Sequence, residues 1–177
     1  MQGTLQKKDL ERYIGDFVYG ANDGIITTFA VVAGIAGAKL SAAIVIILGL
    51  ASLIADGISM AASNYLATKS ESDYLKRETD NHNHHFKDPI KGAIITFVGF
   101  ILVGFAPLIA YVFPFEAKFQ WAIAFAGVSL FAVGAGRTVV TKKGWLKNGI
   151  EMLAIGAVAA GAAYAIGALL RDLVAAA

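Results

Sequence analysis

Two carboxylates lie in a long, mostly apolar stretch near the beginning of the chain, DFVYGANDGIITTFAVVAGIAG, residues 16–37. The polar residues here are three or four positions apart, so a helix would place them on one face. They are Asp16, Tyr19, Asp23 and Thr27. An acid inside a membrane helix is costly and is usually retained for transport or proton handling. We therefore predict that Asp23 is a cation ligand or a proton carrier; the alternative is a structural acid that bonds a neighbouring side chain or backbone amide.

A second polar stripe occurs in residues 42–68, where an apolar first half gives way to polar residues at helical spacing. Its members are Asp56, Ser59, Met60, Ser63 and Asn64. The carboxylate of Asp56 and the thioether of Met60 form a mixed hard and soft ligand pair, which suits Fe²⁺, Co²⁺ or Zn²⁺ better than Mg²⁺ or Ca²⁺. The alternative for Met60 is packing in the core. A tight turn between two antiparallel helices would bring the two stripes to similar depths.

The central polar segment, residues 69–91, contains further residues that could bind a metal. His82, His84 and His85 form a short histidine tract, which could collect metal ions, act as a pH-sensitive element, or be an ordinary solvated loop. Glu71 and Glu78 could extend such a site along the end of a helix. Their alternative is a solvated helix end beside basic residues. We treat all five as a possible cytosolic metal entry.

The composition indicates an integral membrane protein of the all-α class. Hydrophobic residues make up 57% of the 177-residue chain, charged residues 16%, and the mean hydropathy is +0.64. We predict one transmembrane domain, 1–177, with spans at roughly 13–38, 42–68, 91–113, 119–140 and 148–170. Pro107 is expected to kink the third span. Gly20 and Gly24 form a small-xxx-small pair that lets another helix approach closely. The alternative, an unusually apolar soluble bundle, fits such long apolar runs poorly.

The distribution of basic residues predicts the orientation. Five spans put the N-terminus, the central loop and the fourth-to-fifth turn on one side, and that side holds twelve of the fifteen lysines and arginines. They are Lys7, Lys8, Arg12, Lys69, Lys76, Arg77, Lys87, Lys91, Arg137, Lys142, Lys143 and Lys147. The positive-inside rule makes this side cytosolic. We expect a multi-pass protein of a prokaryotic cell (inner) membrane.

Several classes of function find no support in the sequence. There is no cysteine, so disulfides and thiolate chemistry are excluded. No P-loop, GxSxG or HExxH pattern occurs, and we predict that the protein is not an enzyme and has no cofactor. The basic residues flank the predicted spans, so nucleic-acid binding is not expected.

Several blocks of the sequence resemble the vacuolar iron transporter family, in the same order. DGIITTFAVVAGIAGA in the first span resembles the family's DGL signature, and ADGISMAASNYLATKSE resembles its second helix. DPIKGAIITFVGFILVGFAPLIAY and KKGWLKNGIEMLAIGAVAAGAAYAIG are similar to its third and fifth helices. The likeness extends over nearly the whole chain from Asp16 onward.

The resemblance implies a homodimer whose cation path runs between the first two helices of both subunits. It implies export of cytosolic Fe²⁺, and often Mn²⁺ or related ions, in exchange for protons. The acid of the DG motif falls on Asp23, the expected transport carboxylate. The methionine of the ISM motif falls on Met60, and the acid seven residues before the DG motif falls on Asp16, near the cytosolic mouth.

The sequence also departs from the family pattern. Well-studied members carry a large Glu- and Met-rich helical domain between helices two and three. In this chain only a short loop, from about Lys69 to Lys91, joins the corresponding helices. The family's usual proline after the DG motif is Thr28. Two other functions would use the same membrane acids: proton-coupled export of an organic cation, and assembly of a non-transporting membrane protein.

Overall fold

A computed structural model describes residues 2–78, 87–142 and 144–175, and in these ranges the chain is helical throughout, with no strand. The long helices are α1 (Gln2–Gly37), α2 (Ala42–Glu78), α3 (Pro89–Gly104), α5 (Lys118–Gly136) and α7 (Trp145–Ala175). Shorter elements are the 3₁₀ turn η1 (Ala106–Leu108) and the helices α4 (Ile109–Val112) and α6 (Thr138–Thr141). The all-α prediction is confirmed.

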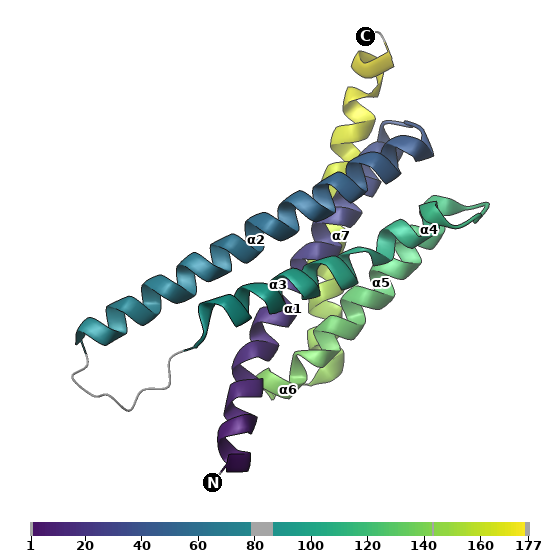
Figure 1. The fold of residues 1–177 in the computed structure, drawn as a ribbon. Helices are drawn as coiled ribbons and strands as arrows, with labels where there is room; N and C mark the ends of the chain where they lie inside the picture. The colour runs from purple at the N-terminus through teal and green to yellow at the C-terminus, as the bar shows by residue number, and fades with distance from the viewer. Residues whose placement is uncertain (1, 79–86, 143, 176–177) are drawn as a thin grey trace.

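Four helices are long and apolar enough to cross a membrane, namely those containing Tyr13–Gly37, Ala42–Arg77, Lys118–Gly136 and Trp145–Arg171. A fifth candidate span results if α3 and the segment η1–α4, which meet at a bend of 43°, are counted together as one span. Pro107 is buried in η1, so the kink expected in the third span is present and lies at this proline. The two termini lie at opposite ends of the molecule (Figure 1).

The helices extend beyond some of the predicted spans. The second span was predicted over roughly 42–68, with the start of the polar segment 69–91 extending the same helix, and α2 does continue to Glu78. The fourth was expected to reach residue 140, whereas α5 ends at Gly136 and is followed by the short helix α6. Polar residues after position 68 do not break a helix, because straight-chain residues such as Lys and Glu have good helix propensity.

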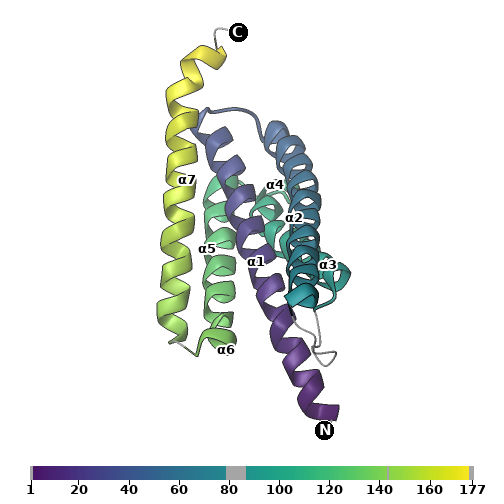
Figure 2. The ribbon, with the colours of Figure 1, turned by 90° about the vertical axis from the view of Figure 1, so that its left-hand side faces the viewer.

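Helix α1 is the centre of the bundle. It packs against α2, α3, α5 and α7, and Figure 2 shows α1, α5 and α7 running side by side with α2 and α3 on the other flank. Residues of α1 that are fully buried include Ala21, Ile25 and Val32. The carboxylates of the first stripe therefore belong to the helix with the most neighbours.

A close helix contact joins α1 and α3 through the predicted glycine pair. A Cβ atom added at Gly24 would lie 2.4 Å from the carbonyl oxygen of Phe100, and one at Gly20 would overlap the carbonyl oxygen of Thr96. From the other side, a Cβ at Gly99 would lie 2.6 Å from the carbonyl oxygen of Phe17. The small-xxx-small prediction is thus confirmed, and it fixes α3 against the polar stripe of α1.

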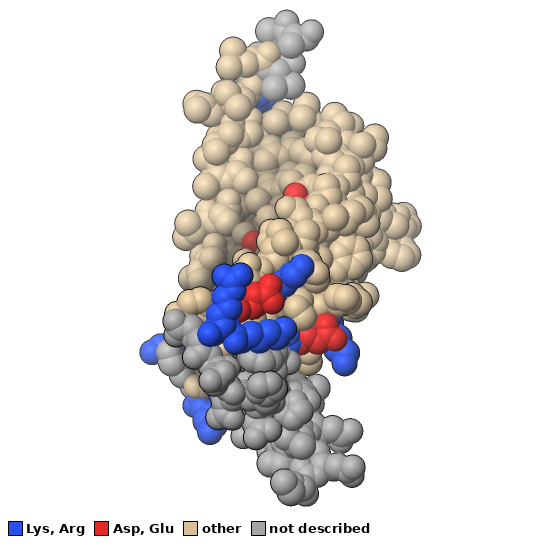
Figure 3. Space-filling view, turned by 60° about the vertical axis from the view of Figure 1, so that its left-hand side comes forward, with Lys and Arg blue, Asp and Glu red and all other residues tan. Residues whose placement is uncertain are grey.

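Charged side chains gather at one end of the molecule. Figure 3 shows lysine, arginine and acidic side chains together in the lower half of the view, and isolated acidic atoms within the apolar middle. Large apolar side chains cover much of the remaining surface, among them Ile47, Ile54 and Ile58 of α2. Exposed apolar residues on helices of spanning length are the pattern expected for lipid contact or helix association.

Candidate functional site

The best-defined polar cluster lies where α1, α2 and the start of α3 meet. Asp16 of α1 is 6% exposed, and its Oδ1 accepts a hydrogen bond from Lys87 Nζ at 2.6 Å and one from Asn64 Nδ2 at 3.1 Å. Lys87 and Asp16 therefore form an ion pair. The Asp16–Asn64 contact confirms that the stripes of α1 and α2 meet at the same depth.

Two oxygen atoms of this cluster have no donor. Asp16 Oδ2 and Asn64 Oδ1 are both buried and neither has a hydrogen-bond partner in the described part of the chain. Both border Gly92 of α3: a Cβ atom there would lie 3.1 Å from Asp16 Oδ2 and 2.9 Å from Asn64 Oδ1. Unsatisfied buried acceptors that face one small space are unusual in folded proteins and require an explanation.

A second pair of carboxylates lies deeper between α1 and α2. Asp23 of α1 and Asp56 of α2 are both partly buried. Asp56 Oδ2 accepts a hydrogen bond from Ser52 Oγ at 2.5 Å, one turn away on α2. The hydroxyl of Thr27 donates to the Asp23 main-chain carbonyl at 2.6 Å, so this hydroxyl bonds to the preceding turn of its own helix.

Together these contacts make two levels of oxygen ligands along the α1–α2 interface. Asp16 and Asn64 form the level nearer the charged end, and Asp23 and Asp56 form the other. Seven residues of helix separate Asp16 from Asp23, which corresponds to a rise of about 10 Å.

Met60 lies on α2 between these levels, one turn from Asp56 and one turn from Asn64. Its side chain is partly buried and packs against the hydrophobic core of the bundle. Within one chain its surroundings fit the packing interpretation, and its position on the stripe also fits the ligand interpretation. Its predicted role as a thioether ligand remains a prediction.

The predicted cytosolic entry is only partly described. Glu71 is exposed on the end of α2, and Glu78 is the last residue of that helix, its side chain outside the described set. His82, His84 and His85 lie outside the described residues. Across the described ranges, no group of three or more His, Cys, Asp and Glu side chains is placed to hold a metal ion.

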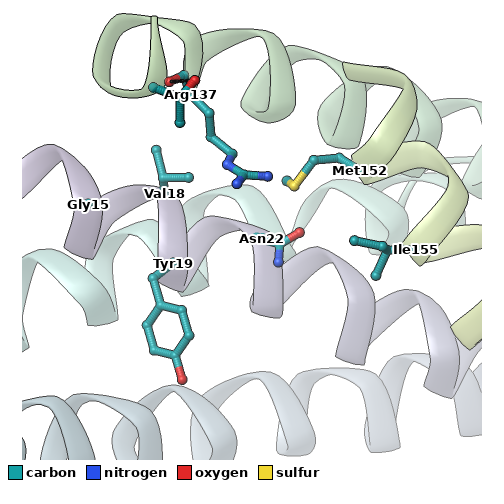
Figure 4. Close-up of a pocket in the computed structure, with 8 residues that line it drawn as sticks. Gly15, Val18, Tyr19, Asn22, Arg137, Met152 and Ile155 are labelled. Carbon is teal, nitrogen blue, oxygen red and sulfur yellow. Dashed lines mark hydrogen bonds between the residues drawn. The ribbon is translucent and has the colours of Figure 1, made fainter. Parts of the chain in front are cut away.

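A cavity of about 330 Å³ lies on another side of α1, between α1, α7 and the segment from Arg137 to Thr141 that includes α6. Figure 4 shows the guanidinium of Arg137 extending into it toward Asn22 and Met152. Asn22 Oδ1 is buried there without a hydrogen-bond partner in the described part of the chain. Asn22 and Asp23 are consecutive, so the cavity and the carboxylate interface lie on different faces of the same helix turn.

Sequence reasoning missed three parts of the site: Lys87 as the partner of Asp16, Gly92 as the space beside it, and Ser52 as the donor to Asp56. A signal for Lys87 was available, because it precedes Asp88-Pro89. Asp88 Oδ1 accepts from the Ile90 amide at 2.9 Å, which is a helix N-cap followed by proline at N1. That start lies at the same end of the bundle as Asp16.

The chain has up to five candidate spans, and carboxylates lie between its helices. These features define a polytopic helical membrane protein with polar groups between its helices. The family model of the VIT family matches residues 14–88 and 79–168. Vacuolar iron transporter homolog 3 of Arabidopsis thaliana is 30% identical over 155 residues, covering 83% of this chain and 78% of the relative. The chain belongs to the VIT family.

Two other relatives match over shorter segments. Vacuolar iron transporter homolog 4 of Arabidopsis thaliana is 32% identical over 125 residues, covering 67% of this chain and 63% of the relative. The vacuolar iron transporter of Toxoplasma gondii (strain ATCC 50861 / VEG) is 44% identical over 66 residues. That match covers 37% of this chain and only 22% of the relative, so the chain corresponds to a small part of that longer protein.

Proposed function

We propose that this protein transports divalent transition-metal ions, Fe²⁺ first and Mn²⁺, Co²⁺ or Zn²⁺ as further candidates, out of the cytosol in exchange for protons. The observation that carries the proposal is the presence of two partly buried carboxylates, Asp23 and Asp56, on neighbouring helices of membrane-spanning length. The names of the relatives, vacuolar iron transporters and their homologs, support the choice of metal.

The chemistry follows from charge. Two carboxylates at one level need a positive counter-charge, which either a divalent cation or protons can supply. The two occupants exclude one another, so binding of metal from one side releases protons and protonation from the other side releases metal. Exchange of metal for protons then requires only that the path opens alternately to the two sides.

We further propose a homodimer with the path at its two-fold axis and the N-terminus in the cytosol. The exposed apolar face of α2, with Ile54 49% and Ile58 57% exposed, supports an additional helix contact beside Asp56. In a dimer the α1–α2 pairs of both subunits would surround one path and double its oxygen ligands. The charged end in Figure 3 supports the orientation, because basic residues are retained on the cytosolic side.

The experiment is metal flux into proteoliposomes that contain a metal-sensitive dye, with an imposed proton gradient. We expect Asp23→Asn to abolish gradient-dependent uptake of Fe²⁺ and Mn²⁺. Asp73→Asn is the matched control, because Asp73 is an exposed carboxylate on the same α2 extension as Glu71 and should transport like the wild type. Equal uptake by the Asp23 variant and the wild type would disprove the role of Asp23.

The same assay separates the two alternatives. An exporter of organic cations should ignore divalent metals, and its activity should not change in Met60→Leu. A non-transporting assembly protein should show no flux, and Asp23→Asn should alter only its oligomeric state. For the metal transporter we expect Met60→Leu to change the ranking of Fe²⁺ against Mn²⁺, since loss of the thioether removes the softer ligand.

The cellular membrane is also part of the proposal. The chain is a multi-pass membrane protein by its spans and its family. The relatives reported above are named as vacuolar transporters from Arabidopsis thaliana and Toxoplasma gondii, which gives no support to the prokaryotic inner membrane expected from the sequence.

A further inference from the structure

Lys87 occupies a special position at the charged end of the path. Its ammonium is bound to Asp16 Oδ1 at 2.6 Å and lies 5.7 Å from the centre of the Tyr13 ring, one helical turn away on α1. The side chain of Lys87 remains 26% exposed, while that of Asp16 is 8% exposed. The lysine therefore reaches from the surface to a carboxylate that is almost fully buried.

The cluster contains more acceptors than Lys87 uses. Its ammonium engages one oxygen of Asp16, and the other oxygen, Oδ2, has no donor in the described part of the chain. Asn64 Oδ1 also lacks a donor, and both atoms face the space beside Gly92. The Lys87 ammonium carries one charge and bonds one oxygen of this site. The two other oxygen atoms, Asp16 Oδ2 and Asn64 Oδ1, are of the kind that divalent cations prefer as ligands.

We propose that Lys87 is a tethered counter-cation for the entrance site, which an incoming divalent metal displaces from Asp16. This inference rests on the proposed transport function. The metal takes the carboxylate of Asp16 together with Asn64 Oδ1 beside Gly92, and the Lys87 ammonium moves outward to solvent. A monovalent ion in this position only replaces one positive charge with another, whereas a divalent ion doubles the attraction to the carboxylate. Lys87 therefore contributes to selection by charge.

The position of the lysine in the chain supports this exchange. Lys87 immediately precedes Asp88, the N-cap of α3, whose backbone amide donates to the Tyr13 hydroxyl at 3.3 Å. The main chain at this point is therefore attached to α1, and only the lysine side chain has to move. Four rotatable carbon–carbon bonds allow that movement without a change in the helices.

The test compares the KM for Mn²⁺ in proteoliposomes between wild type, Lys87→Met and Lys87→Arg. We expect Lys87→Met to lower KM about three- to tenfold, because the metal no longer competes with an ammonium. Lys87→Arg should raise KM, since a guanidinium also reaches for the second carboxylate oxygen. Lys91→Met is the matched control: Lys91 is exposed on the first turn of α3, and its variant should keep the wild-type KM.

A binding measurement distinguishes this inference from the transport proposal. The rise in melting temperature caused by added Mn²⁺ should be larger for Lys87→Met than for wild type in detergent, whether or not metal is moved across a membrane. Absence of flux in the wild type would disprove the transport function alone. Unchanged KM and an unchanged Mn²⁺-induced shift in Lys87→Met, or a lower KM in Lys87→Arg, would overturn the counter-cation. If Lys87→Met does not fold, the direction of the Lys87→Arg change decides.

Discussion

The contact between α1 and α3 gives the sharpest test of the fold, through Gly24→Ala. The added Cβ atom would lie 2.4 Å from the Phe100 carbonyl oxygen and 3.0 Å from its carbonyl carbon and Cα. Ordinary contacts of this kind begin near 3.4 Å, so the helices must separate locally by about 1 Å. The obstacle is main chain, which cannot rotate away as a flexible side chain could.

The cost is expected to be about 1–3 kcal/mol, the range for overpacking of a well-packed core. Gly34→Ala is the matched control on the same helix, because its Cβ would lie 3.5 Å from the nearest atom, the Ala163 carbonyl oxygen. Alanine has the better helix propensity by about 1 kcal/mol at both positions, so that gain cancels in the comparison. The difference between the two variants therefore reports the α1–α3 contact.

The assay is thermal unfolding in detergent, followed by circular dichroism. On the scale of soluble domains of this size, the Gly24 variant should melt about 2–12 °C below the Gly34 variant. Flux by the Gly24 variant should fall as well, because α3 also carries Gly92 beside Asp16 and Asn64. Equal melting temperatures for the two variants would refute the argument that the glycine is required for close approach.

Three further predictions concern stability and use the same melting assay. Asn148→Ala should lower the free energy of unfolding by about 1–3 kcal/mol. Asn148 is 1% exposed, and its Nδ2 donates to Thr138 Oγ1 at 3.3 Å and to Thr141 Oγ1 at 2.9 Å. An unchanged melting temperature would argue against these hydrogen bonds. Thr28→Val should stabilise by about 1 kcal/mol, since the Thr28 hydroxyl is buried with no partner among described residues, and a lower melting temperature would contradict this. Lys39→Gly should raise the free energy of unfolding by about 0.5–1 kcal/mol, and with it the melting temperature, because Lys39 has φ 56°. A lower melting temperature would show that the Lys39 side chain stabilises the turn.

Much of the fold follows from patterns that are local in the sequence. Apolar runs of spanning length predict membrane helices, and proline at position 107 predicts the bend, because proline removes a helix hydrogen bond wherever it occurs. The glycine pair predicts a close contact but not its partner. That α3 supplies the partner, through Thr96 and Phe100, depends on how segments distant in the chain pack together.

The polar stripes illustrate the same division. Helical periodicity alone aligns Asp16 with Asp23 and Asp56 with Asn64, and a short turn alone makes the two helices antiparallel, so the sequence determines that these residues share an interface. Only the tertiary structure decides that Asp16 pairs with Lys87, 71 positions later. The same is true of the space beside Gly92. Two charged side chains form an ion pair when they are close in space, and their separation along the chain does not show whether they are.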